Sequence, residues 1–310
     1  MGALFSFLSA AYYVPKLYFG STPATISVRT AANSKTAEKI PLNDFLQLRV
    51  PSLRQAFKPA WWLNSGHLQT AYCVLGDFSK VEYRKLIWTL DGGTIGLDFT
   101  PPAEERTLKH DTPIVVVLHG LTGGSHESYV RSILAPVCTP VEQGGLGYRG
   151  IVVNFRGCAG VPMTSSQLYS ALHTEDIRVA VMYIAKQYPC APLIGVGFSL
   201  GANILTRYLA QEGSNSRLVA GCALGCPWDL FASSDRLESR LLHRLNLQNL
   251  VARHRDALAK FPDSMLWKMV EARLPKNDMS LMDFDDTTTR VAGGSSPPFP
   301  FASARHYYAA

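Results

Sequence analysis

Short β-branched runs alternate with helical stretches along the middle of this chain, and this alternation restricts the possible folds more than any other feature. The runs are PIVVVL (113–118), IVVN (151–154), LIGV (193–196) and LVAGCAL (218–224). A continuous apolar run is typical of a strand buried on both faces of a parallel sheet. The sequence therefore predicts an α/β fold with a doubly wound, mostly parallel sheet and right-handed crossovers.

Residues 175–188 show the clearest helical spacing, with an apolar stripe on one face and two acidic residues at the start. Upstream, residues 81–90 and 94–99 are joined by Asp91-Gly92-Gly93, which predicts a β-hairpin because an Asp-Gly turn supplies positive φ angles. Residues 229–275 have helical spacing without a strand pattern. They predict a helical insertion over the carboxyl edge of the sheet.

The chain is accordingly divided into four parts. We expect an N-terminal apolar segment and arm (1–60), an α/β core (61–228), a helical cap insertion (229–290) and a return to the core (291–310). Residues 21–60 are mixed in composition and are interpreted as a linker or surface arm. The length of 310 residues suits one large α/β domain with an insertion, or two average domains.

The first 20 residues are apolar and aromatic, but Pro15 and Lys16 interrupt them before they reach the length of a bilayer span. A basic region and a cleavage site are lacking, which argues against a secretory signal. Two interpretations remain open: an interfacial membrane anchor, or a helix packed on the core. Gly2 and Ser6 also fit the loose N-myristoylation pattern. We expect an intracellular protein, either cytoplasmic or peripheral to a membrane through residues 1–20.

Composition excludes several classes of protein. With 47% hydrophobic residues the chain is not disordered, and a net charge of +6 over 310 residues is too small for a nucleic-acid footprint. The six cysteines are scattered, which predicts buried thiols in a reducing compartment and no zinc site or disulfide framework. They are Cys73, Cys138, Cys158, Cys190, Cys222 and Cys226, the last two predicted to pack in the core.

One local motif carries chemistry. Gly197-Phe198-Ser199-Leu200-Gly201 follows the LIGV run directly and opens the helical stretch ANILTRYLA. A G-x-S-x-G motif between a strand and a helix is typical of a nucleophile elbow, in which a sharp turn lifts the serine above the sheet. The turn leaves space only for glycine at positions 197 and 201. By itself the motif also occurs in ordinary turns, but its flanking strand and helix favour Ser199 as a catalytic nucleophile.

A second motif, HGLTGG (119–124), follows the PIVVVL run. In this architecture the residue after the nucleophile and a residue of that upstream loop supply the backbone N–H groups of an oxyanion hole. The predicted donors are Leu200 and Leu121. His119 precedes the nucleophile, so we interpret it as a structural residue that holds the oxyanion loop by hydrogen bonds. His126 and His173 are also interpreted as structural.

Several stretches together resemble a known family. They are NSGHLQTAY (64–72), DGGTIGLDF (91–99), HGLTGGSHESYVR (119–131), VVNFRGCAG (152–160) and GVGFSLGANIL (195–205). In this order they resemble the AB hydrolase superfamily, and within it subfamily 4. That subfamily includes bacterial YheT-like esterases, animal abhydrolase-domain lipases and fungal medium-chain acyl-CoA:ethanol acyltransferases. The resemblance implies the α/β-hydrolase fold and a serine enzyme acting on acyl esters, with Asp and His partners on loops after the last strands.

Those last strands are missing from the printed sequence. The family-like segments 283–286 (DFDD) and 307–308 (YY) are present, but the chain stops at Ala310 before an apolar strand that could carry a triad Asp or His. The later histidines are His243, His254 and His306. The first two are predicted on the solvated faces of Arg-rich helices, and the third lies too close to the terminus. The sequence therefore predicts a chain truncated at its C-terminus, whose sheet ends on an unpaired edge.

Two functions of different classes remain open. The first is a serine-dependent ester hydrolase or acyltransferase that forms an acyl-serine intermediate with a lipophilic, medium-chain acyl ester or acyl-CoA. The second is a catalytically inactive hydrolase fold that serves as a binding or interaction module. A metal-dependent hydrolase is disfavoured because the histidines are dispersed. We expect no cofactor, no metal and no nucleic-acid partner.

Overall fold

A computed structural model of the chain describes residues 13–22, 24–29, 37–63, 65–75, 83–238, 250–252, 254–271 and 280–310. The chain divides into two compact units between Leu75 and Gly76. We call them the amino-terminal unit and the α/β unit. The division falls after residue 75, whereas the boundary predicted from the sequence lies at residue 60. No helix among the described residues combines the length and the apolar character that a bilayer crossing needs.

The amino-terminal unit contains regular structure where the sequence predicted an arm. Strands β1 (Thr25–Arg29) and β2 (Ala37–Pro41) pair antiparallel, and α1 (Leu42–Arg49), a 3₁₀ turn (Pro51–Arg54) and α2 (Gly66–Leu75) follow. Residues 21–60 therefore contain regular structure that the interpretation as a linker or surface arm did not include. The two strands form because Ile26, Val28 and Ile40 alternate with polar residues, as in a strand with one apolar face. This alternation is too short to be recognised from the mixed composition of the segment.

The apolar N-terminal segment is described only from residue 13, and the possible myristoylation site lies outside the described residues. Residues 14–20 are extended or irregular, with Tyr13 bridged to Phe57. The side chains of Val14 and Tyr18 are exposed. In this described part the segment is therefore no helix packed on a core. Membrane contact through residues 1–20 stays a prediction.

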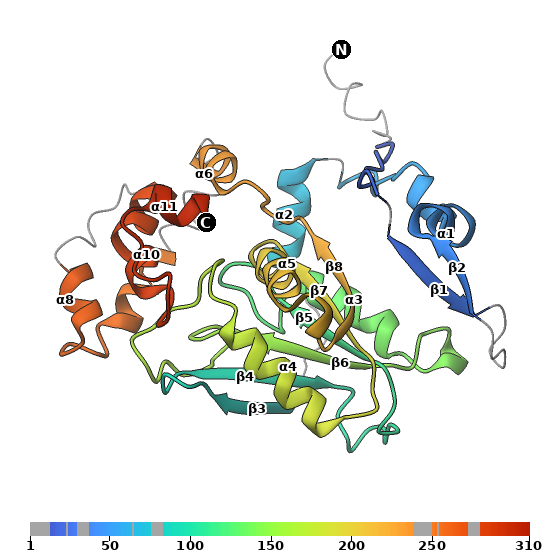
Figure 1. The fold of residues 1–310 in the computed structure, drawn as a ribbon, viewed down its shortest axis with the longest axis horizontal. Coiled ribbons are helices and arrows are strands. Elements are labelled where there is room, and N and C mark those ends of the chain that lie inside the picture. The colour runs from blue at the N-terminus through green and yellow to red at the C-terminus, as the bar shows by residue number, and fades with distance from the viewer. Residues whose placement is uncertain are drawn as a thin grey trace, which may run out of the picture. The chain divides into compact units, whose positions relative to one another are not determined.

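Within the described residues, the α/β unit is built on one six-stranded sheet of order β3-β4-β6-β5-β7-β8 (Figure 1). The strands are β3 (Tyr83–Trp88), β4 (Thr94–Thr100), β5 (Ile114–Leu118), β6 (Arg149–Asn154), β7 (Leu193–Phe198) and β8 (Leu218–Leu224). The first two form the predicted hairpin, and the other four are parallel. The predicted hairpin and all four predicted strands are thus confirmed.

Helices cover both faces of this sheet. They are α3 (Ser128–Cys138), α4 (Glu175–Gln187) and α5 (Leu200–Glu212), with short 3₁₀ turns at Val141–Gln143 and Gly213–Asn215. Alternate residues of β5 enter two separate clusters: Val116 packs with α4 and α5, and Val117 packs with α3. This two-sided burial explains the continuous β-branched run, since each side chain has an apolar neighbour on its own face.

Strand β8 forms one edge of the sheet, as predicted, and its residues after Leu218 are exposed. This position corrects two predictions about cysteines, because Cys222 is exposed and Cys226 is only half-buried. Cys190 is exposed too, and only Cys158 is fully buried among the described thiols. The side chain of Cys73 lies outside the described residues. An apolar sequence predicts a strand, but its burial depends on what packs beside it.

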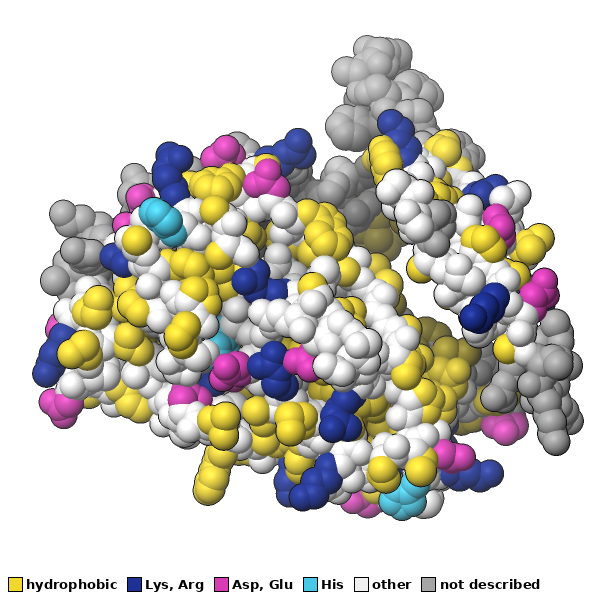
Figure 2. Space-filling view, in the orientation of Figure 1, with side chains coloured by type: hydrophobic (Ala, Val, Ile, Leu, Met, Phe, Trp, Pro, Cys, Tyr) yellow, Lys and Arg dark blue, Asp and Glu magenta, His cyan; other side chains and the backbone are white. Residues whose placement is uncertain are grey.

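The predicted insertion includes α6 (Leu230–Glu238) and α8 (Met265–Glu271), and its residues 250–252 and 254–258 are helical too. Residues 239–249, 253 and 272–279 of the predicted insertion lie outside the described residues. The C-terminal part contains α9 (Leu281–Phe284), a π-helical turn (Asp285–Thr289), α10 (Arg290–Ala292) and α11 (Ala304–Ala309). Apolar side chains gather on the surface over α8 and α10 (Figure 2).

The two family-like C-terminal segments contact each other. The Tyr308 hydroxyl donates a 2.7 Å hydrogen bond to a carboxylate oxygen of Asp285, and the Ala304 N–H donates a 2.7 Å bond to Asp286. Thr289 donates a further hydrogen bond to Asp285. Burial raises the pKa of Asp285 to about 6, and these two hydroxyl hydrogen bonds only partly offset that effect.

The raised pKa predicts how stability changes with pH. The folded state binds the Asp285 proton more tightly than the unfolded chain, so this contribution to stability is present below pH 3.8 and is lost as the pH rises through 6. We expect the free energy of unfolding of the wild type, relative to Asp285→Asn, to fall by about 3 kcal/mol across this range. Urea unfolding at both ends of the range measures it. Asp286→Asn is the control: it keeps Asp285 and should retain the pH dependence of the wild type. Loss of that dependence in Asp286→Asn, or its persistence in Asp285→Asn, would contradict the assignment to Asp285.

Candidate active site

Ser199 lies at the sharp turn between β7 and α5. Its backbone has φ 50° and ψ −115°, a positive φ that a residue with a Cβ rarely adopts. The turn is fixed by hydrogen bonds: the Ser199 N–H donates to Leu224 at 2.9 Å, and its carbonyl accepts from Ala202 and Asn203. The side chain is exposed at the carboxyl end of the parallel strands. The strand–turn–helix context predicted for the elbow is therefore present.

The two motif glycines are required by close backbone approaches. A Cβ on Gly197 would lie 2.5 Å from the Gly201 carbonyl oxygen. A Cβ on Gly201 would lie 2.5 Å from the carbonyl oxygens of Leu118 and His119. These distances are shorter than any normal contact, so only glycine lets the start of α5 approach the end of β5 this closely. The same approach brings the serine next to the loop that follows β5.

That loop contains Leu121, one of the two predicted oxyanion donors. A Cβ on Gly120 would lie 3.6 Å from the Ser199 Cβ, so the loop adjoins the serine at the residue before Leu121. Among the described residues, no hydrogen bond is formed by the N–H of Leu121 or of Leu200. Leu200 is the first residue of α5, where the helix dipole adds positive potential. Both amides are therefore available to a developing negative charge, and their catalytic role stays a prediction.

Two tyrosine hydroxyls hold the loop on either side of Leu121. The Gly120 N–H donates to the Tyr129 hydroxyl at 3.0 Å, and the Thr122 N–H donates to the Tyr169 hydroxyl at 3.1 Å. Thr122 has φ 59°, a left-handed conformation that needs such support in a residue other than glycine. Both neighbouring amides are engaged, so the Leu121 amide is the one of the three that makes no hydrogen bond within the described residues. Sequence reasoning missed this pair of tyrosines.

His119 has the structural role that the sequence predicted. It is fully buried, and its Nε2 accepts a 3.1 Å hydrogen bond from the Phe155 N–H. The other ring nitrogen, Nδ1, therefore carries the proton and donates to the Gly120 carbonyl at 2.7 Å. Burial lowers the pKa of His119 to about 4, so the ring is neutral at physiological pH. The imidazole thus joins the end of β5 to the residue after β6.

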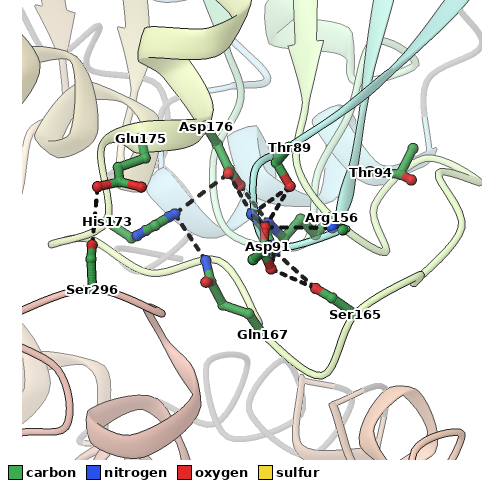
Figure 3. A network of polar contacts seen from close by, with 12 residues as sticks. Thr89, Asp91, Thr94, Arg156, Ser165, Gln167, His173, Glu175, Asp176 and Ser296 are labelled. Atoms are coloured by element: carbon green, nitrogen blue, oxygen red, sulfur yellow. Dashed lines mark hydrogen bonds and ion pairs between the residues drawn. The ribbon is translucent and has the colours of Figure 1, made fainter.

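A buried ion-pair network holds the loop that carries Tyr169 (Figure 3). Arg156 follows β6 and makes two hydrogen bonds to each of two carboxylates, Asp91 in the hairpin turn and Asp176 in the first turn of α4. Thr89 and Ser165 also contact the guanidinium. Burial alone would raise the pKa of both aspartates, but the hydrogen bonds from Arg156 outweigh it and hold both below their usual value.

The network also explains the glycine that ends the predicted turn. A Cβ on Gly93 would lie within van der Waals overlap of the Arg156 guanidinium, so the hairpin can close on Arg156 only with glycine there. His173 belongs to the same region, with its Nε2 2.8 Å from the side-chain amide of Gln167 and 3.4 Å from Asp176. His126 is exposed beside Glu127. Neither histidine makes a hydrogen bond or an ion pair with Ser199, as expected of structural residues.

The structure does not bring a triad base to Ser199. Among the described residues, no histidine makes a hydrogen bond with the serine hydroxyl. His254 is 7% exposed, packs on Tyr169 and Phe284, and donates to the Leu250 carbonyl, so its prediction as a solvated residue was wrong. The arginines near it in the sequence concealed its apolar neighbours. His306 is exposed and bonded to Ser303, and His243 lies outside the described residues.

Comparison with known proteins supports the assignment of the family. The family model described as the alpha/beta hydrolase fold matches residues 113–270, which is just over half of the chain. This chain belongs to the alpha/beta hydrolase family. The hydrolase match includes β5, the oxyanion loop, the elbow and part of the helical insertion. The predicted fold class is thereby confirmed, whereas the narrower resemblance to subfamily 4 stays a prediction.

Curated proteins similar to this chain include two with names from lipid chemistry. An abhydrolase domain-containing protein of Dictyostelium discoideum is 33% identical, and the match covers 82% of this chain and 62% of that protein. The human phospholipase ABHD3 is 34% identical, with 81% and 60% covered. A yeast monoacylglycerol lipase is 28% identical, with 87% and 68% covered. The chain thus spans less than two thirds of the length of the first two.

The Arg156 network predicts a large loss of stability when its cation is removed. Arg156→Met leaves the buried Asp176 and the half-buried Asp91 without a counter-charge, and removing one partner of a buried pair typically costs about 3–5 kcal/mol in the free energy of unfolding. Arg178→Met is the matched control, because its partner Glu212 and Arg178 itself are partly exposed and such pairs contribute about 0–1 kcal/mol. Urea unfolding compares the two variants. Equal losses would contradict the structural role given to Arg156.

The tyrosine pair predicts a selective change in backbone protection. Tyr169→Phe removes the acceptor of the Thr122 N–H, and we expect its amide hydrogen exchange to accelerate roughly two- to tenfold. Tyr129→Phe should accelerate exchange at Gly120 instead. Each variant is the control of the other, and nuclear magnetic resonance follows both amides. If each substitution changed both amides alike, the loop would not be held at two independent points.

Proposed function

We propose that Ser199 is the nucleophile of an acyl-transfer reaction on lipophilic esters or thioesters. The observation that carries this proposal is the strained, exposed serine at the end of β7, next to the free amides of Leu121 and Leu200. The serine oxygen would attack the carbonyl carbon, and the two amides would stabilise the oxyanion that forms. Loss of the alcohol or thiol leaves an acyl-serine. Water or a second alcohol then takes the acyl group.

The lipophilic substrate class is supported by two observations. The named relatives include a phospholipase and a monoacylglycerol lipase. In the predicted cap region, Met265 and Met269 of α8 are exposed, and flexible methionines suit contact with alkyl chains. We also propose that the exposed aromatic residues near the N-terminus, such as Tyr18, contact a membrane surface. The membrane would be the source of a lipid substrate.

The rate of acylation at Ser199 depends on whether a base activates its hydroxyl. A serine hydroxyl needs a base to become a good nucleophile at neutral pH, and no described histidine contacts Ser199. Loss of triad members lowers rates by a factor on the order of 10⁴ to 10⁶, with residual catalysis from the oxyanion hole. A site made only of the described residues would therefore acylate Ser199 slowly and turn over little.

A second candidate function is a binding or interaction module that keeps the hydrolase fold without catalysis. The specific observation in its favour is the placement of the described histidines. His254 is engaged by the helical region and His306 by Ser303. The intact elbow and oxyanion loop favour the enzyme, because binding alone would not require a strained serine conformation.

A fluorophosphonate probe separates the two functions. We expect the wild type to be labelled covalently, with the modified peptide containing Ser199, because the probe forms a phosphonyl-serine in the same oxyanion hole. Ser199→Ala should abolish the label, and Ser132→Ala, a serine bonded within α3, should retain it. Intact-protein mass spectrometry measures the result. Labelling that persists in Ser199→Ala would reject Ser199 as the nucleophile, and a wild type that stays unlabelled after prolonged incubation with excess probe would favour the module.

A further inference from the structure

A cavity lies at the opposite end of the sheet from Ser199. It has a volume of about 420 Å³, and Lys85, Arg106, His110, Arg149, Tyr183 and Tyr188 are among its lining residues. Arg149 is the first residue of β6, whose parallel neighbour β5 pairs with the start of β7. Ser199 follows the other end of β7. At about 3.3 Å per residue the two places are roughly 20 Å apart, so the cavity is separate from the candidate active site.

The cavity is positively charged without a counter-ion. Lys85, Arg106 and Arg149 each carry a permanent charge, and the lining contains no aspartate or glutamate. Among the described residues, none of the three forms an ion pair or a hydrogen bond through its side chain. The last turn of α4 also borders the cavity, but a helix carboxyl end supplies only about half a negative charge. Three positive charges therefore remain largely uncompensated.

Burial makes this imbalance costly. Arg149 is 9% exposed and one of its terminal nitrogens is buried with no hydrogen-bond partner. Two guanidinium nitrogens of Arg106 are also buried and unpartnered. A buried cation is normally paired with an anion, since its desolvation is otherwise unfavourable. An anion bound between the two arginines would supply that pair, and the low-dielectric walls would strengthen the attraction.

The remaining lining indicates what kind of anion fits. The Arg149 guanidinium lies over the Tyr188 ring, 4.1 Å from its centroid. This cation–π contact holds the guanidinium group in place before a ligand binds. Tyr183, Phe99 and Leu108 add apolar wall. Arginine pairs recognise phosphate oxygens by several hydrogen bonds at once. The volume is larger than a phosphate group alone requires, and the apolar wall suits an attached organic group.

We propose that this cavity is a binding site for a phosphate monoester, with Arg106 and Arg149 holding the phosphate and the tyrosine-lined wall holding the organic group. The site is distant from Ser199 and does not depend on the proposed acyl transfer. Two sources share this chemistry: a soluble phosphate ester, and the headgroup of a phosphatidate in a membrane. Binding from either source places negative charge beside the same two guanidinium groups.

Isothermal titration with inorganic phosphate and with phenyl phosphate tests the site in the full chain. We expect saturable binding, tighter for phenyl phosphate because of the apolar wall. Arg149→Gln and, separately, Arg106→Gln should weaken it about tenfold or more, since each removes a charged hydrogen-bond donor. Lys186→Gln is the matched control: it removes one positive charge from the last turn of α4 outside the lining, and it should retain wild-type affinity.

Sedimentation with phosphatidylcholine vesicles, with and without phosphatidate, distinguishes the two sources. Phosphatidate-dependent binding that is lost in both arginine variants supports the site with a lipid headgroup, and soluble binding lost in both supports it with a free ester. Arg106 lies on a loop, so binding by Arg106→Gln still tests the site even if Arg149→Gln were to unfold the end of β6. Absence of saturable binding from both sources, or equal weakening by Lys186→Gln, would overturn the proposal.

Discussion

The contact between Arg156 and its two carboxylates organises much of the α/β unit. It joins three places that are distant in the sequence: the hairpin turn at Asp91, the end of β6 and the start of α4 at Asp176. The loop between Arg156 and α4 is thereby fixed at both ends. Its Tyr169 supports the oxyanion loop, and its Ser170 and Ala171 bond to Gly293 and Tyr307 of the C-terminal region. One buried cation thus connects the sheet, the candidate active site and the C-terminal helices.

The geometry of the candidate site results from close contacts of the backbone as much as from side chains. Gly201 lets α5 approach the end of β5, so the serine turn and the oxyanion loop meet although 80 residues separate Ser199 from His119. The strain at Ser199 and at Thr122 is balanced by the hydrogen bonds that their N–H groups donate to the Leu224 carbonyl and the Tyr169 hydroxyl. Parallel strands bring these loops to one edge, which is where open α/β sheets place their sites.

The strands and the serine turn could be predicted from the sequence because their signals are local. A β-branched run and a glycine-flanked serine carry their meaning within a few residues. The errors arose where tertiary neighbours decide the outcome. His254 is buried by aromatic rings from distant segments, and Cys222 is exposed because β8 is an edge. The support of Leu121 by Tyr129 and Tyr169 spans nine and 47 residues, and no local pattern marks it.

The buried imidazole of His119 has a consequence for acid–base behaviour. Its two nitrogens are committed to one tautomer by Gly120 and Phe155, and its low pKa keeps it uncharged from mildly acidic to alkaline solution. His119 therefore adds no change of charge to the loop that it anchors throughout that interval. A reaction at Ser199 would therefore owe any rise or fall of its rate with pH to groups other than this imidazole.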